Sequence, residues 1–459
     1  MTGKPAAGDL PRVIGFWGGT ALIVGITIGS GIFRKPYTLA RDVGDPPAIL
    51  GLWVFFGAIS LCGALALAEL SSMLPRTGGV YVYLRSAYGD AAAFVFGWLY
   101  LLVATPATLG ALSTFFAELL VGLSGARMEA AGSWTVPVVA ATTVVVLTAA
   151  NFLGVRLGSA IQTSFTVVKV AALLGLVMAC FVFASGSFGH LRPSATGPAN
   201  LGSGAASVIW AYDGWIAVSM IAGEVAAPEK RLKRIIVFGM LSIVVLYLAA
   251  NLGYFYVMPV EAMATEAGGV PQSIMGGLMG PSGAWAIGAL ILCSVFGALN
   301  GNVLAKPRVA FAMARDGLTF SFLGRAHPRF ATPYAALWIQ AAMALVLIAL
   351  LRDFDRLTTY FVVVEWSALL FAVGAVIVLR RRQPDAPRPF RTPGYPAVPL
   401  AFLAGTLVGL VAIVWGEVRQ PVPNYSPLVG LVIAAAGFPA YRLWSRMAKP
   451  AIPDTPRVA

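Results

Sequence analysis

The sequence predicts an all-α membrane protein with twelve transmembrane helices. Hydrophobic residues make up 58% of the 459 positions and charged residues 11%, with a mean hydropathy of +0.81. Soluble domains typically carry about 25% charged residues. A soluble chain of this composition would expose far more apolar surface than folded proteins tolerate. The chain is therefore expected to lie in a bilayer.

The apolar runs define the individual spans, because a helix needs roughly 20 apolar residues to cross the hydrocarbon core. The expected spans lie near 13–33, 48–73, 90–122, 135–153, 157–186, 204–225, 235–258, 283–313, 333–351, 357–380, 397–417 and 426–444. The N-terminal sequence has no short apolar core followed by a small-residue cleavage site. The first span is thus expected to stay in the membrane.

The basic residues predict the orientation of these spans. With a cytoplasmic N-terminus, roughly 23 lysines and arginines fall on the cytoplasmic side and roughly 8 outside. The cytoplasmic set includes Lys230, Arg231, Lys233, Arg234, Lys306, Arg308 and Arg380. We expect a multi-pass protein of the plasma (inner) membrane with both termini cytoplasmic and lipid headgroups near its cations. The net charge of +13 forms no basic stripe for nucleic acid.

Two spans are interrupted by glycine at corresponding positions. Gly29-Ser30-Gly31 interrupts the first span, and Tyr212-Asp213-Gly214 interrupts the sixth. Each cluster alone is typical of a helix-packing surface. Because a broken helix opens each set of five spans, the pair instead indicates an inverted-repeat transporter. The predicted units are residues 1–199, residues 200–383, and residues 384–459 with the last two helices and the tail.

Helix breaks in the membrane free backbone groups that lipid cannot satisfy. Freed amides at a half-helix N-terminus suit a carboxylate. Freed carbonyls at a half-helix C-terminus suit an ammonium group. The two breaks together predict a site for a zwitterionic amino acid.

Several motifs along the chain resemble those of amino acid–polyamine–organocation (APC) transporters. They are Gly29-Ser30-Gly31-Ile32-Phe33, the loop PRTGGVYVYL from Pro75 to Leu84, Phe165 to Lys169, Ala211-Tyr212-Asp213-Gly214-Trp215 and Ala312 to Gly317. Within that superfamily the chain is similar to the L-type amino acid transporter branch and to bacterial serine/threonine exchangers. The resemblance implies a LeuT-like fold of two inverted five-helix repeats plus two peripheral helices.

The resemblance also implies roles for residues at the two breaks. The amides of Ser30 and Gly31 are expected to bind the substrate carboxylate. The carbonyls expected to meet its ammonium group are those of Thr27, Trp210, Ala211 and Asp213. Gating and coupling are assigned to Lys169, Trp215, Gly29 and Tyr212. Trp215 would cover the substrate as a gate, or it is an ordinary core aromatic.

Charged residues inside the spans leave alternatives open. Lys169 is implied to bridge spans one, five and eight, either as a titrating group or as a charged tether. Asp213 either caps its broken helix or faces the cavity, where it would favour a polar or cationic substrate. Glu69 is expected near the cytoplasmic mouth with a loop arginine as partner, while the role of Glu118 and Glu365 stays undetermined.

The predicted function is therefore exchange of neutral L-amino acids, small ones such as alanine, serine or threonine, by alternating access. Proton-coupled symport through Lys169 is the alternative mechanism. A channel or a membrane-embedded enzyme is the alternative from a different functional class. The only histidines, His190 and His327, lie in loops, and no phosphate-binding loop occurs. No catalytic residue, metal or cofactor is expected.

The three cysteines, Cys62, Cys180 and Cys293, fall inside apolar runs without metal-ligand spacing. Animal L-type transporters are linked to a heavy subunit through a cysteine in the outer loop after span three. Residues 122–136, the corresponding loop, contain none. No disulfide-linked heavy chain is expected.

Overall fold

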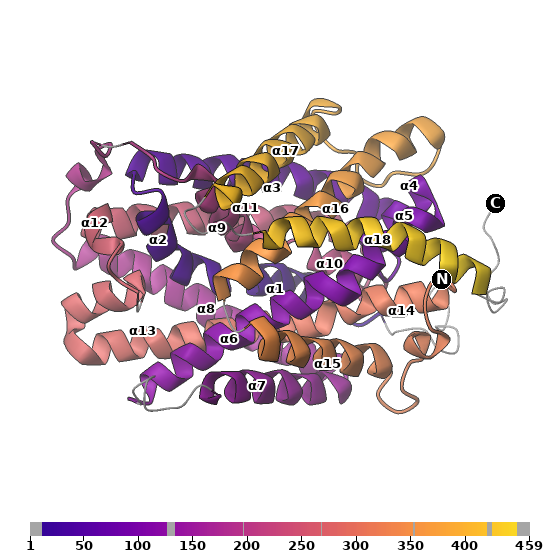
Figure 1. Ribbon diagram of the computed structural model, residues 1–459, viewed down its shortest axis with the longest axis horizontal. Coiled ribbons are helices and arrows are strands. Elements are labelled where there is room, and N and C mark those ends of the chain that lie inside the picture. The colour runs from indigo at the N-terminus through magenta and orange to yellow at the C-terminus, as the bar shows by residue number, and fades with distance from the viewer. Residues whose placement is uncertain are drawn as a thin grey trace.

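Helices form nearly all of the regular structure. The computed structural model describes residues 12–125, 134–195, 197–267, 269–351, 354–419 and 425–447. Within these ranges the only strand-like feature is a single backbone bridge between Ile14 and Val225. The long helices run side by side along the long axis of the molecule (Figure 1).

The elements follow one another in two groups. The first group comprises α1 (Phe16–Thr27), α2 (Gly31–Asp42), α3 (Pro46–Met73), α4 (Val80–Tyr88), α5 (Asp90–Leu99), the π-helical turn η1 (Tyr100–Ala104), α6 (Thr105–Leu123), α7 (Thr135–Phe152), α8 (Val155–Val182) and η2 (Phe188–Leu191). The second comprises α9 (Leu201–Tyr212), α10 (Ala217–Met220), η3 (Ala222–Glu224), α11 (Pro228–Val257), α12 (Val260–Met263), α13 (Val270–Ala305), α14 (Pro307–Arg315), η4 (Ser321–Gly324), α15 (Tyr334–Leu351), α16 (Phe354–Arg382), α17 (Ala397–Val418) and α18 (Ser426–Met447).

Ten helical segments in the described ranges are long and apolar enough to cross a membrane. The expectation of a helical membrane protein is thus confirmed at that level. Two predicted spans fall outside these ten. The span near 204–225 is broken into α9, α10 and η3, and the span near 333–351 corresponds to the shorter helix α15. The count of twelve and the inverted repeat stay predictions.

One local expectation was wrong. The segment from Pro75 to Leu84, expected as a loop, contains the start of helix α4. Helix α13 consists of two helices that meet at Gly280, whose φ of 68° lies in the left-handed region, and the expected eighth span near 283–313 matches the second of them together with α14. Pro281 follows directly and lacks the N–H that a continuous helix requires, so a bend forms there.

Helix α1 lies at the centre of the bundle, where it packs against α8, α11 and α13 (Figure 1). Helices α4 and α14 lie at one end, on the right of the view, and α12 lies at the opposite end. Peripheral helices carry exposed apolar side chains, among them Val408 of α17 and Val432 of α18. Such surfaces suit contact with lipid tails.

Two cations assigned to the cytoplasmic surface are in fact buried. Lys306 and Arg308 are 4% and 1% exposed, at the junction of α13 and α14. Arg308 Nε donates to Glu224 Oε1 at 2.9 Å, and its Nη2 donates to Oε2 at 3.2 Å. Arg308 is covered where it pairs with Glu224 of η3, and the side of the membrane assigned to both cations stays a prediction. The ion pair fastens α14 to the segment that follows α10.

Removing one partner of this ion pair is expected to destabilise the protein. Glu224→Gln keeps the shape of the side chain but leaves the Arg308 charge buried without a counter-ion. We expect a loss of about 3–5 kcal/mol in unfolding free energy, measured by thermal unfolding in detergent. The double variant Glu224→Gln/Arg308→Gln should retain more stability than the single one. Equal losses in both would contradict a stabilising pair.

Candidate functional site

The first helix break separates α1 from α2. After Thr27 the chain leaves the helical region at Ile28, whose φ and ψ are −74° and 75°. Helix α2 resumes at Gly31, and its first helical hydrogen bond runs from the Arg34 amide to the Ser30 carbonyl at 2.8 Å. The first amides of α2 therefore have no acceptor within the helix. They present the positive end of the helix dipole to the break.

The second break lies between α9 and α10. Asp213 is extended, with φ −65° and ψ 150°, and Gly214 has a φ of +121°, which only glycine adopts readily. The Asp213 amide donates to the Trp210 carbonyl at 3.2 Å. The other carbonyls of the last turn of α9 have no acceptor role within the helix. This break therefore presents the negative end of a helix dipole.

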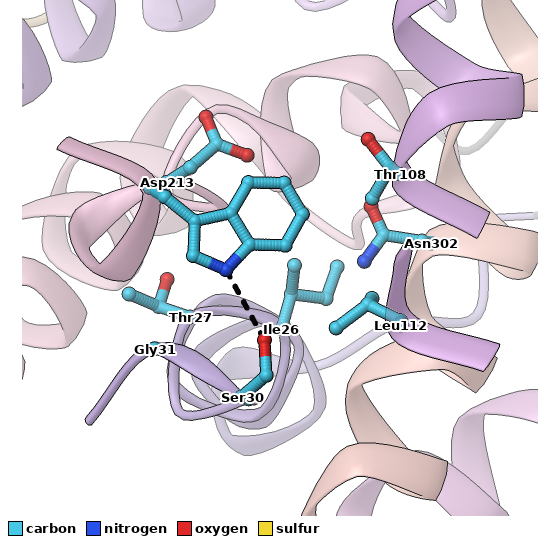
Figure 2. Close-up of a pocket in the computed structure, with 10 residues that line it drawn as sticks. Ile26, Thr27, Ser30, Gly31, Thr108, Leu112, Asp213 and Asn302 are labelled. Atoms are coloured by element: carbon cyan, nitrogen blue, oxygen red, sulfur yellow. Dashed lines mark hydrogen bonds between the residues drawn. The ribbon is translucent and has the colours of Figure 1, made fainter. Parts of the chain in front are cut away.

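The two breaks lie directly against each other. The indole Nε1 of Trp210 donates to Ser30 Oγ at 3.1 Å, the bond drawn in Figure 2. A Cβ added at Gly31 would lie 2.4 Å from the Cα of Ala211. The start of α2 thus touches the end of α9 backbone to backbone. Free amides and free carbonyls are brought together, as the zwitterion hypothesis requires.

A small cavity of about 20 Å³ opens between the breaks. Its walls are Ile26, Thr27, Gly29, Ser30, Gly31, Thr108, Leu112, Trp210, Asp213 and Asn302 (Figure 2). Helix α6 contributes Thr108 and Leu112, and α13 contributes Asn302. Many of the predicted site residues therefore line one cavity.

Three predicted backbone ligands have other contacts in this conformation. The Trp210 carbonyl accepts from the Asp213 amide at 3.2 Å. The Thr27 carbonyl accepts from the Gly29 amide at 2.8 Å and from the Tyr247 hydroxyl at 2.6 Å. Ala211 packs against Gly31 behind the cavity wall. Contact between the Thr27 carbonyl and a substrate ammonium would have to share or replace one of these bonds.

The aromatic residues expected to gate or couple the site lie elsewhere. The ring of Trp215 is fully buried, 6.3 Å from that of Phe402 on α17, and Trp215 is not among the residues that line the cavity. The Tyr212 hydroxyl donates to the Trp53 carbonyl at 3.1 Å, on α3. Trp210 is the aromatic residue in contact with the cavity. The gating role of Trp215 stays a prediction.

Lys169 connects three helices next to the first helix break. Its ammonium group donates to the carbonyls of Gly25 at 2.6 Å, Ile28 at 2.9 Å and Ser294 at 2.6 Å. The Ser294 hydroxyl also donates to the Ile28 carbonyl at 2.9 Å. The lysine thus bridges α8, the end of α1 and α13, the connection that the resemblance implies. Its role in transport stays a prediction.

Glu69 has the arginine partners expected for it. Arg380 donates to both of its carboxylate oxygens, at 2.9 and 2.7 Å, and the loop residue Arg388 lies 3.4 Å away. The Thr392 amide donates at 2.7 Å. This network joins α3 to the end of α16 and the loop after it.

Other cavity residues were missed by the sequence analysis. They are Ile26, Thr108, Leu112 and Asn302. Threonine and leucine give no signal within an apolar span, because only the packing of α6 against the breaks turns them inward. The polar run Asn300-Gly301-Asn302 inside the eighth span was a usable signal, since amides are uncommon in lipid-facing helix. Lys306, read as a loop cation, was missed for the same reason as Arg308.

A profile of the amino acid permease family matches residues 14–436. The chain belongs to the amino acid permease family. It is accordingly a multi-pass membrane transporter rather than an enzyme, and it lies within the APC group of the sequence analysis.

The permease is similar to several transporters over most of its length. It is 32% identical to the serine/threonine exchanger SteT of Bacillus subtilis, over 94% of this chain and 96% of that protein. It is 29% identical to the mouse b(0,+)-type amino acid transporter 1, over 94% and 88% of the two chains. It is 26% identical to the human cystine/glutamate transporter, over 95% and 86%.

Proposed function

We propose that this permease exchanges small neutral L-amino acids across the plasma membrane by alternating access. The observation that carries the proposal is the contact between the two helix breaks around one cavity, bonded from Trp210 to Ser30. The free amides at the start of α2 bind the substrate carboxylate, with Ser30 and Gly31 as donors. The carbonyls of Ala211 and Asp213 at the end of α9 accept from its ammonium group, and that of Trp210 shares its bond from the Asp213 amide.

The lining of the cavity supports a small polar substrate. Opposite the breaks, Thr108 and Asn302 offer a hydroxyl and an amide to a polar side chain. The similarity to a serine/threonine exchanger supports the same choice. Alanine, serine and threonine are the proposed substrates.

The contacts of Lys169 support exchange rather than proton-coupled symport. An ammonium group has three N–H donors, and Lys169 directs its donors to three backbone carbonyls. Loss of a proton would leave one buried carbonyl without its donor, which costs about 1–3 kcal/mol. A permanently charged tether avoids this cost. Symport through Lys169 is the second candidate, since a buried lysine at a helix break is a possible proton carrier.

The proposed architecture is the LeuT-like one, with twelve helices in two inverted repeats, 1–199 and 200–383, followed by the two helices of 384–459. The matched breaks of α1–α2 and α9–α10 support it. Both termini are proposed to be cytoplasmic, from the distribution of loop cations; the tails, 1–11 and 448–459, lie outside the described residues.

We propose that the carrier works without a disulfide-linked heavy chain. The loop expected to carry such a link has no cysteine in its sequence, and residues 126–133 within it lie outside the described residues. Its partners are then the amino acid and the surrounding lipids, with no metal or other cofactor.

Counterflow in proteoliposomes tests the proposed function. Vesicles loaded with unlabelled serine should take up labelled serine several-fold faster than empty vesicles, because an exchanger returns inward only with cargo. Alanine and threonine should compete, and a bulky amino acid such as tryptophan should not. A pH gradient that drives accumulation into empty vesicles would overturn exchange in favour of symport. No saturable uptake under either condition would overturn the amino acid site.

A further inference from the structure

A buried lysine lies directly behind the cavity wall. Lys306 Nζ donates to Thr108 Oγ1 at 3.1 Å, and Thr108 lines the cavity. The ammonium group also lies over the rings of Tyr100 at 5.0 Å and Phe361 at 4.7 Å. Only one side chain therefore separates this positive charge from the space that a substrate occupies.

Two acids interact with the same lysine, the half-buried Asp213 and the buried Glu365. Asp213 lines the cavity, and its Oδ1 atom is buried without a hydrogen-bond partner among the described residues. Glu365 accepts from the Tyr100 hydroxyl at 3.1 Å through Oε1, while its Oε2 has no such partner in the same ranges. Lys306 interacts electrostatically with both acids, although no ion pair within 4 Å joins it to either in the described chain.

The side chain of a bound amino acid would meet this cluster. With the carboxylate and ammonium held at the two breaks, the remaining polar wall consists of Thr108, Asn302 and Asp213. A lone aspartate on that wall would attract a second positive charge strongly, because charges interact far more strongly in a buried site than in water. Lys306 opposes that attraction, since it adds a positive charge behind the same wall.

We propose that Lys306 makes the permease selective for neutral side chains by balancing the charge of Asp213 at the side-chain wall of the cavity. This inference rests on the proposed amino acid site and adds its specificity. Thr108 positions the lysine, and the rings of Tyr100 and Phe361 hold the ammonium group behind the wall. Without Lys306 the wall is anionic and accepts cationic amino acids.

The test compares two probes of nearly equal size. L-Homoserine and L-2,4-diaminobutyrate differ in a terminal hydroxyl or ammonium group. Each competes with labelled serine for counterflow in serine-loaded proteoliposomes. In the wild type, homoserine should inhibit much more strongly than diaminobutyrate. In Lys306→Met the ratio of their inhibition constants should shift toward diaminobutyrate by roughly tenfold or more, the effect of one charged hydrogen bond.

A double variant separates charge balance from a structural role. Lys306→Met/Asp213→Asn removes both charges and should restore the preference for homoserine. A lysine that only supports the fold would not be rescued in this way. Lys306→Arg, which keeps the charge, should keep the wild-type ratio.

The reverse substitution keeps the proposal testable if Lys306→Met does not fold. Asp213→Asn removes a negative charge that balances Lys306. L-Aspartate should then inhibit more strongly relative to L-asparagine than it does in the wild type. If Lys306→Met folds, an unchanged ratio of the homoserine and diaminobutyrate inhibition constants would overturn the proposal. If it does not fold, an unchanged ratio for aspartate and asparagine in Asp213→Asn would do so. Failure of wild-type serine counterflow is a different result, because it overturns the proposed function itself.

Discussion

Gly31→Val is expected to abolish measurable substrate binding. A Cβ at Gly31 would lie 2.4 Å from Ala211 Cα and 2.6 Å from Ala211 Cβ. Because the nearest atom is backbone, the neighbour cannot rotate away. The start of α2 must then move off the end of α9, which separates the carboxylate donors from the ammonium acceptors. Loss of two charged hydrogen bonds, at about 1.5–3 kcal/mol each, lowers affinity by roughly a hundredfold or more.

Binding to the purified protein measures this effect without the complication of transport rate. Serine-dependent thermal stabilisation and labelled-serine binding should both disappear in Gly31→Val. Gly51→Val is a matched control, because a Cβ at Gly51 on α3 meets no atom within 4 Å. The control should bind serine as the wild type does. Wild-type affinity in Gly31→Val would remove the paired breaks from the binding site.

Hydropathy predicted the helices well because membrane insertion is a local property of each segment. Most predicted spans end within a few residues of a helix in the structure, as 135–153 does beside α7. The deviations have tertiary causes. Helix α4 is too short to be read from hydropathy, and its buried residues Val80 and Tyr81 depend on packing. The helix before the bend at Gly280 was not predicted, because the expected span began near 283.

The candidate site was predictable only where it is formed by backbone groups at the helix breaks. An aspartate such as Asp213 is unusual inside an apolar span, and the glycine clusters occur at corresponding positions of two spans, so the breaks stood out. Thr108 and Asn302 depend on how α6 and α13 pack against those breaks, which no short pattern records. Lys306 was misread because counting loop cations assumes that they are exposed. In the structure its buried charge is balanced by Asp213 and Glu365 and lies over two aromatic rings.

Lys169→Met is expected to reduce serine counterflow at least tenfold while the protein remains folded. Lys169→Ala is expected to cause the same reduction together with a further loss of packing. Both variants remove the donor shared by the carbonyls of Gly25, Ile28 and Ser294. The Ile28 carbonyl keeps its bond from the Ser294 hydroxyl, and a buried carbonyl left without any donor costs about 1–3 kcal/mol. Because two of the three lie at the end of α1, the break loses the connection that fixes it to α8 and α13.

Initial rates of counterflow, together with gel filtration and thermal unfolding, distinguish a transport defect from misfolding. Lys233→Met is a matched control, since Lys233 is a half-buried lysine that donates to a single carbonyl, that of Pro389, at 3.2 Å. It should exchange serine at the wild-type rate. Full activity of Lys169→Met would show that α1 keeps its broken geometry without the lysine. The contacts between Gly31 and Ala211 and between Trp210 and Ser30 would then be sufficient to hold the site together.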